Sequence, residues 1–283
     1  MARPLWKITG KTLDLTGRAL IMGVLNVTPD SFSDGGSFAD PDRAVSHGLR
    51  MAADGAAIID VGGESTRPGA DAVSEAEELQ RVIPVVSRLR EGCDAFISID
   101  TTKPAVACAA LDAGASIIND ITGGTGDEEM LGVAAERGCG FVIMHMQGTP
   151  RTMQNAPHYD DVVGEVAEFF RQQYARAVQC GIEPMAIAFD PGIGFGKTVQ
   201  HNLELLRNIP RLRIADRPLV IGVSRKSFLG KMIGSPEMAR RSAPTIALTA
   251  MLRDRGANVL RVHDVKENVD ALRTTEAFLD PAL

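Results

Sequence analysis

The chain has 283 residues, of which 45% are hydrophobic and 23% are charged. This composition is typical of a folded globular protein and excludes disordered, collagen-like and coiled-coil chains. Thirty Lys and Arg against 36 Asp and Glu give a formal net charge of −6. Because general nucleic-acid binding needs a basic surface, we expect no nucleic-acid partner. The length suits one large domain or two small ones.

Hydropathy and cysteine usage bear on the location of the protein. No apolar run approaches the roughly 18 residues that a transmembrane helix needs, so no membrane partner is expected. Charged residues interrupt the first 18 positions, which does not fit a signal peptide. The four cysteines are scattered, with no close pair for a metal knuckle. We therefore expect reduced thiols and a cytoplasmic protein.

Short apolar, β-branched runs follow one another along the chain. Residues 5–8 and 11–15, joined at Thr9-Gly10, predict a hairpin within residues 1–18. Eight further runs are continuously hydrophobic, as expected for parallel strands buried on both faces. These eight predicted strands are residues 20–26, 57–61, 96–100, 116–120, 141–145, 187–190, 219–223 and 259–261.

Helical segments fill the gaps between the predicted strands. Ser74 and Glu77 form a capping-box pattern ahead of an apolar stripe that reaches Leu89. Pro104 suits the first turn of the next helix, and helices are also predicted over 161–179 and 265–279. The alternation predicts an α/β fold, a single (β/α)8 TIM barrel over about residues 19–280. No domain boundary is visible in residues 1–283, the hairpin is expected to plug the base of the barrel, and a doubly wound open sheet is the alternative.

Polar residues follow the predicted strands, where a barrel collects its chemistry. A single Asp after a strand usually caps the following helix. Eight strands that each end in polar residues at the same opening of a barrel, its mouth, are hard to explain as helix caps. The strand ends carry Asn26, Asp60, Asp100, Asn119-Asp120, His145, Asp190, the Ser224–Ser227 segment and Arg261-Val262-His263-Asp264.

These groups divide by chemistry. Asp100, Asn119 and Asp190 offer acceptors and one amide, and with Lys226 they suit a planar ligand with a guanidine-like edge and a ring carbonyl. A second set, Arg67, Arg261 and His263 with Asn26, suits a phosphate or a metal–phosphate complex. Surface ion pairs are the structural alternative for the two arginines. His145 alone is read as a buried histidine with satisfied hydrogen bonds.

Three common motifs of phosphate binding, dinucleotide binding and nucleophilic catalysis are incomplete in this sequence. Gly196-Lys197-Thr198 resembles the end of a P-loop, but position 191 is Pro where that loop needs Gly. Gly192 and Gly194 are not followed by the third glycine of a dinucleotide fingerprint. These glycines are interpreted as letting the backbone approach a flat ligand. The Ser224 segment lacks a nucleophile elbow, so no enzyme nucleophile stands out.

The motifs at the strand ends resemble those of dihydropteroate synthases, a family of pterin-binding enzymes, over about residues 20–276. The matching segments are MGVLNVTPDSFSDGG (22–36), IDVGGESTRPG (59–69), IDTTKP (99–104), IND (118–120), MHMQG (144–148), DPGIGFGK (190–197), SRKS (224–227) and RVHDV (261–265).

The resemblance implies a reaction and its partners. It implies an alkyl transferase of folate biosynthesis that joins p-aminobenzoate to (7,8-dihydropterin-6-yl)methyl diphosphate, giving 7,8-dihydropteroate and diphosphate. It also implies Mg²⁺ as the required ion, a homodimer, and sulfonamides as competitive inhibitors. Diphosphate leaves readily once its charge is neutralised, so we expect a dissociative, SN1-like substitution. The loops 28–36 and 63–69 would then close and exclude water.

The resemblance also implies roles for individual residues. Asp100, Lys226, Arg261 and His263 are the expected catalytic residues, and Asn26 is the expected metal ligand. The expected pterin site consists of Asp100, Asn119, Met144, Asp190 and Lys226. The expected diphosphate site consists of Asn26, Thr66, Arg67, Arg261 and His263. The expected p-aminobenzoate site consists of Phe32, Arg67, Pro68, Phe195 and Ser227, the last near a helix N-terminus.

One segment departs from the family pattern. Between Gly234 and Leu252 the family commonly has Arg followed shortly by Gly or Ala and Ser or Thr, whereas this chain has Pro244. We expect Pro244 in the first turn of a helix capped near Ser242, with no effect on the matched site residues. Three other functions stay open. They are a silent paralogue that only binds pterin, a methyltetrahydrofolate-binding methyltransferase barrel, and an unrelated phosphate-binding barrel.

Overall fold

A computed structural model describes residues 3–28, 40–66 and 69–280. Eight parallel strands lie in one sheet in the order β8-β7-β6-β5-β4-β3-β10-β9. A bridge between Phe189 and Leu219 joins β8 to β9 and closes this sheet into a barrel. The barrel prediction is therefore confirmed, and the open sheet is excluded. The strands are β3 (Leu20–Asn26), β4 (Ile58–Gly62), β5 (Phe96–Asp100), β6 (Ile117–Asp120), β7 (Gly140–Met144), β8 (Ile187–Asp190), β9 (Val220–Ile221) and β10 (Val259–Val262).

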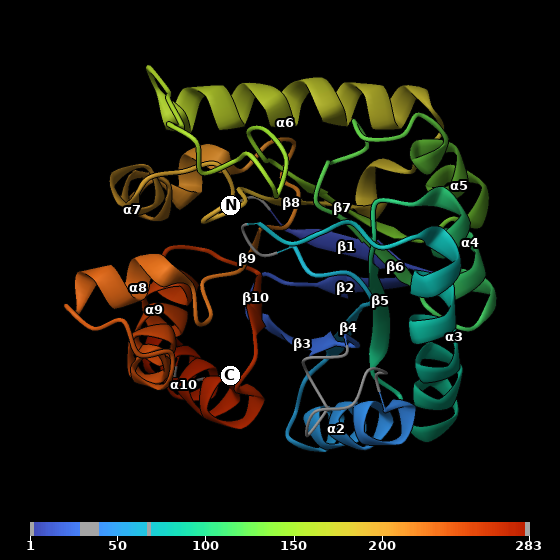
Figure 1. Cartoon of the computed structure of the whole chain (residues 1–283). Helices are drawn as coiled ribbons and strands as arrows, with labels where there is room; N and C mark the ends of the chain where they lie inside the picture. Colours follow the sequence, from blue (N-terminus) through green and yellow to red (C-terminus); the bar gives the residue numbers. More distant parts are fainter. Residues whose placement is uncertain (1–2, 29–39, 67–68, 281–283) are drawn as a thin grey trace.

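Helices surround the strands as an outer layer (Figure 1). Their starts follow local chemistry: Ser74 accepts the N–H of Glu77 at the head of α3, and Pro104 occupies the first turn of α4. The α-helices are α2 (Pro41–Ala53), α3 (Glu75–Gly92), α4 (Pro104–Asp112), α5 (Glu129–Arg137), α6 (Val162–Gln179), α7 (Val199–Arg207), α8 (Ser227–Met232), α9 (Ser242–Asp254) and α10 (Val265–Leu279). Short 3-10 helices are η1 (Pro184–Ala186), η2 (Ile209–Leu212) and η3 (Ala239–Arg241).

The N-terminal hairpin closes the base of the barrel, as predicted. It consists of β1 (Leu5–Ile8) and β2 (Lys11–Asp14), which pair antiparallel. Trp6 and Ile8 are fully buried against the lower barrel residues, including Met22 and Val142. The indole N–H of Trp6 donates to the Ala186 carbonyl at 2.8 Å, which satisfies its one polar group.

The start of α9 differs from the prediction. Pro244 does lie in the first turn, but the N-cap is Arg241, which makes no side-chain capping hydrogen bond, and Ser242 is already helical. The preceding 3-10 turn η3 leads directly into α9, so no capping hydroxyl marks the boundary. Among the described residues, none of the helices combines the length and the apolar character needed to cross a membrane.

Candidate active site

The strand register gathers polar residues at the carboxyl end of the barrel. Asn26 pairs with Gly62, Gly62 with Asp100, and Asp100 with Asn119, so one row of register partners runs across four adjacent strands. Met144 and Asp190 are register partners on the next two strands. The predicted pterin residues on these strands therefore lie together at the carboxyl end of the barrel, which we call the mouth. Residues far apart in sequence meet there because each ends or nearly ends a neighbouring strand.

A buried ionic network occupies the barrel interior below this mouth. Arg261 donates from Nε to Asp60 and from Nη2 to Asp100, each at 2.7 Å. Asn119 donates its amide N–H to the same oxygen of Asp60 at 3.0 Å. Asp60 is fully buried, and its second oxygen Oδ1 has no hydrogen-bond partner. One guanidinium therefore organises two carboxylates, which excludes the surface ion pair considered for Arg261.

Burial and the ionic network together determine the pKa of Asp100. Burial raises the pKa of the Asp100 carboxyl to about 7, and the Arg261 guanidinium opposes that rise. Burial alone would lower the pKa of Arg261, but Asp60 and Asp100 together raise it, so this side chain stays charged. Asp100 is thus a carboxyl that titrates near neutral pH beside a permanent cation.

Asp190 and Lys226 form a second polar pair, across the join between β8 and β9. The backbone N–H of Gly192 donates to Asp190 at 2.7 Å. Lys226 donates to the Ile193 carbonyl, and its Nζ lies 4.7 Å from the centre of the Phe195 ring. Burial lowers the pKa of Lys226 to about 8 and raises that of Asp190. The predicted pterin residues Asp190 and Lys226 and the predicted p-aminobenzoate residue Phe195 are therefore neighbours.

Two glycines of the DPGIGFGK segment are required by packing within the protein itself. Gly192 has φ +63°, and a Cβ there would lie 1.9 Å from the His145 carbonyl oxygen. A Cβ on Gly196 would lie 2.5 Å from the Gln147 carbonyl oxygen. Gly192 and Gly196 therefore let two backbone segments of the protein approach each other, while the close approach of this segment to a flat ligand stays a prediction.

Lys197 and His145 are buried together behind the mouth. Lys197 Nζ lies 3.0 Å from His145 Nδ1 and donates to the Phe195 carbonyl at 3.0 Å. Burial and the neighbouring Lys226 lower the pKa of Lys197 to about 7. Burial and Lys197 lower the pKa of His145 to about 3, so the imidazole is neutral and can accept from the ammonium. His145 is therefore a buried histidine, as predicted, with a hydrogen-bond partner at Nδ1.

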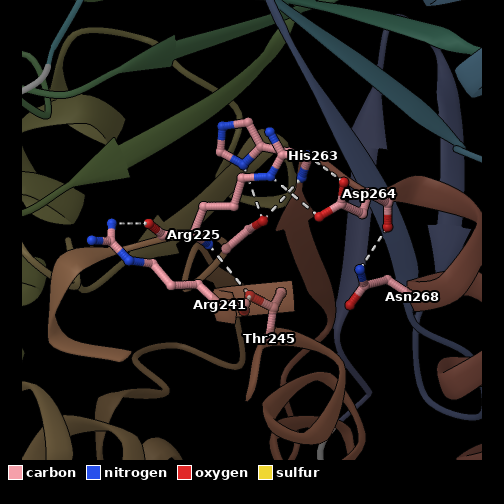
Figure 2. Close-up of polar contacts among 7 residues, drawn as sticks. Arg225, Arg241, Thr245, His263, Asp264 and Asn268 are labelled. Carbon is pink, nitrogen blue, oxygen red and sulfur yellow. Dashed lines mark hydrogen bonds and ion pairs between the residues drawn. The ribbon is translucent and has the colours of Figure 1, made fainter. Parts of the chain in front are cut away.

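His263 lies on the other side of the mouth, beside Ser224. The Ser224 hydroxyl is 3.0 Å from His263 Nδ1 and accepts the His263 backbone N–H at 3.1 Å. The residues that follow Ser224 and His263 in the sequence are also paired: Arg225 donates from Nε to Asp264 at 3.2 Å (Figure 2). The loops after β9 and β10 are therefore linked at two successive positions.

Thr66 borders a cavity of about 290 Å³ that also reaches Asp100 and Thr101. Behind it, Lys103 forms ion pairs with Glu64 and with the buried Glu78. Three predicted site residues, Phe32, Arg67 and Pro68, lie outside the described residues, as do most of the first predicted loop and part of the second. Ser227 is exposed as the first residue of α8.

Sequence reasoning missed the role of Asp60. The sequence placed it at a strand end, whereas it is the middle residue of β4 and points into the barrel network. A carboxylate inside the apolar run Ile58-Ile59-Asp60-Val61 was the available signal, because a buried charge needs a partner. The segment 234–252 was expected to be separate from the matched segments. Instead, Arg241 and Thr245 contact the backbone of Arg225, which lies within the matched segment SRKS (224–227).

Asn26 is suited to the expected Mg²⁺. The ion prefers oxygen ligands and takes many of them from substrate phosphates and water rather than from a complete protein cage. Within the described part of the chain, no group of three His, Cys, Asp or Glu side chains forms a complete metal site. The amide oxygen of Asn26, at the carboxyl end of β3, fits a single protein ligand beside a diphosphate.

Comparisons with known proteins agree with this geometry. Residues 22–263 match the family model described as pterin binding enzyme. Dihydropteroate synthase of Escherichia coli K12 is 48% identical over 270 residues, covering 95% of each chain. The Yersinia pestis dihydropteroate synthase solved with a sulfonamide drug complex has a TM-score of 0.91 at 44% identity, covering 97% of this chain and 99% of that one. The Xanthomonas albilineans synthase in complex with 7,8-dihydropteroate has a TM-score of 0.87 at 40% identity, covering 98% and 99%. The chain belongs to the pterin-binding enzyme family, as one of its dihydropteroate synthases.

Proposed function

We propose that this chain condenses (7,8-dihydropterin-6-yl)methyl diphosphate with p-aminobenzoate, giving 7,8-dihydropteroate and diphosphate. The observation that carries the proposal is the mouth itself, where Asp100, Asn119, Asp190 and Lys226 converge beside Arg261. Relatives solved with 4-aminobenzoic acid and with 7,8-dihydropteroate support the same pair of substrates.

The carboxylates and Lys226 bind the pterin in this proposal. A pterin presents N–H donors on its guanidine-like edge and an oxygen acceptor on its ring. Asp190 and Asn119 accept from that edge, and the Lys226 ammonium donates to the ring oxygen. Met144, which is buried, packs against the ring from below. Asp100 completes the set while Arg261 holds it in place.

The diphosphate faces the cationic side of the mouth. Arg261 binds the two carboxylates through Nε and Nη2, and we assign its Nη1 to the anion. His263, held by Ser224, and the hydroxyl of Thr66 complete this side, together with Arg67. A Mg²⁺ ion held by Asn26 would neutralise charge on the diphosphate.

The substitution is dissociative in our proposal. Departure of diphosphate leaves a methylene cation conjugated with the electron-rich pterin. The amine of p-aminobenzoate attacks that carbon and then releases one N–H proton, which leaves neutral dihydropteroate. Phe195 and Ser227 border the p-aminobenzoate side, and we assign Phe32, Arg67 and Pro68 to it as well. Sulfonamides would compete for this position, as the drug complex of the Yersinia pestis relative supports. We expect the protein to contribute to catalysis by positioning the amine and by excluding water from the cation.

Diphosphate release tests the function directly. Purified protein is incubated with the dihydropterin diphosphate and Mg²⁺, with and without p-aminobenzoate. Release that depends on p-aminobenzoate and yields dihydropteroate supports the proposal. Pterin binding without such turnover would instead identify a silent binding protein.

Pterin affinity is expected to peak between about pH 7 and 8. Below about 7 Asp100 gains a proton and loses its charge, and above about 8 Lys226 loses its ammonium. The affinity for a hydroxymethyl dihydropterin without phosphate, measured by calorimetry from pH 5.5 to 9.5, should therefore fall on both sides. Replacing Lys226 with Arg, which stays charged, should remove the alkaline fall. A flat wild-type profile would contradict these assignments.

We propose a homodimer from the exposed apolar surface, and a cytoplasmic location from the cysteines. We assign a homodimer to the side of the barrel formed by α8, α9 and α10 (Figure 1). Exposed apolar side chains gather on these helices and on the segment between α8 and α9: Met232, Ile233, Met238, Met251, Phe278 and Leu279. Light scattering should then give the mass of two chains. The four cysteines are free thiols, which supports a reducing, cytoplasmic location.

A further inference from the structure

The first turn of α9 reaches the loop that carries Lys226. Arg241 donates from Nη1 to the Arg225 carbonyl at 2.9 Å and from Nη2 to the Pro236 carbonyl at 3.0 Å. Thr245 accepts the Arg225 backbone N–H at 3.3 Å and donates to the Arg241 carbonyl at 2.7 Å. Both backbone polar groups of Arg225 are therefore held by side chains at the start of α9, one from its N-cap residue and one from its first turn (Figure 2).

Arg225 has a backbone conformation that needs such support. Its φ is +59°, in the left-handed region that residues with a side chain rarely adopt. It lies between Ser224, which contacts His263, and Lys226, which faces Asp190. The conformation of Arg225 therefore sets the directions of two neighbouring side chains, one toward each half of the mouth.

The same helix also supports the neighbouring loop. Asp264, which pairs with the Arg225 side chain, accepts at its carbonyl from the Asn268 amide at 2.6 Å. Asn268 in turn accepts from the Thr249 hydroxyl at 2.7 Å, and both of these side chains are fully buried. Thr245 and Thr249 are one helical turn apart on the buried face of α9, so one rigid element fixes the loops that carry Lys226 and His263.

We propose that Arg241 and Thr245 are positioning residues for catalysis, which hold Arg225 in its left-handed conformation and thereby fix Ser224 and Lys226. Neither side chain needs to touch a substrate for this role. The proposal rests on the proposed function, because it assigns Lys226 and His263 to the two halves of the substrate. It also gives the segment 234–252 a role in the site.

The test compares four variants in p-aminobenzoate-dependent diphosphate release. Thr245→Val keeps the side-chain shape but removes the hydroxyl, Thr245→Ser keeps the hydroxyl, and Arg241→Met removes both donors. Thr275→Val is the matched control, because it removes a hydroxyl bonded only to the Ala271 carbonyl within α10. Melting temperature, kcat and KM are measured for each variant at a temperature at which circular dichroism shows it folded.

The expected result is a fall in kcat of about 10- to 100-fold for Thr245→Val and Arg241→Met, because small displacements of positioned groups have large kinetic effects. Thr245→Ser should restore most of the rate, and Thr275→Val should leave it unchanged. A lower melting temperature with unchanged kcat would overturn the proposal, since the contacts would then stabilise the fold alone. If Arg241→Met does not fold, Arg241→Lys, which keeps the charge but not the paired donors, replaces it. Inactive wild-type protein would instead refute the proposed function.

Discussion

Replacing Arg261 with methionine is expected to lower the free energy of unfolding by about 3–5 kcal/mol and to abolish turnover. Arg261 neutralises two carboxylates, Asp60 and Asp100, and Asp60 is fully buried. Removing the guanidinium leaves these charges without their cation in a low-dielectric interior, and it also removes the proposed contact with diphosphate. Urea denaturation and the diphosphate-release assay measure the two losses separately.

A double variant separates stability from catalysis. Combining Arg261→Met with Asp60→Asn removes the fully buried one of the two unpaired charges, so part of the stability should return while turnover stays lost. Arg253→Met is the matched control, because Arg253 forms a buried ion pair with Glu276 at 3.0 Å and donates to the Gly17 carbonyl, near the start of β3 rather than at the strand ends. It should lower stability and leave kcat unchanged. Full turnover by the double variant would contradict the proposed role of Arg261.

Replacing Asp190 with asparagine is expected to lower pterin affinity by about 10- to 100-fold. A hydrogen bond to a charged group contributes about 1.5–3 kcal/mol, and the neutral amide presents one acceptor where the carboxylate presents two. The Gly192 N–H can still be satisfied by the remaining oxygen, so the loop should keep its conformation. Calorimetry with the phosphate-free pterin gives the affinity of each variant.

Asp120→Asn provides the control for this substitution. Asp120 is also a buried carboxylate after a strand, but it accepts from the backbone N–H groups of Thr122 and Gly124 in its own loop. We expect a loss of stability without a loss of pterin affinity. Equal losses of affinity in the two variants would indicate that burial of a carboxylate, rather than its place in the mouth, determines the effect.

The fold was predictable because most strands are continuous apolar runs and several intervening helices have their own start signal, as at Ser74 and Pro104. The closing strand shows the limit of this reasoning. Residues 219–223 were predicted as a strand, but the observed strand is Val220–Ile221, which pairs with β10, and the join to β8 is a single bridge at Leu219. Strand length depends on the partner strands, which local sequence does not describe.

The gathering of polar side chains at the mouth was predictable where a polar residue ends an apolar run, as at Asp100, Asn119 and Asp190. Asp60 was missed because its role depends on a partner 201 positions away along the chain. Arg241 was missed for the same reason: its guanidinium supports the backbone of Arg225, a contact made through folding rather than through a motif. Sequence patterns identify side chains that face a ligand more readily than those that hold other side chains.

The closure of the barrel by one bridge has a consequence for the response to ligand. The seam between β8 and β9 has the Phe189–Leu219 bridge, whereas each other neighbouring pair of barrel strands shares two or more register partners. Asp190 and Lys226 stand on opposite sides of this seam. A pterin held by both side chains therefore adds a noncovalent crosslink at the point of fewest backbone contacts. Hydrogen exchange at Phe189 should slow on binding more than exchange at the remaining strand pairs, because local opening there then requires release of the ligand.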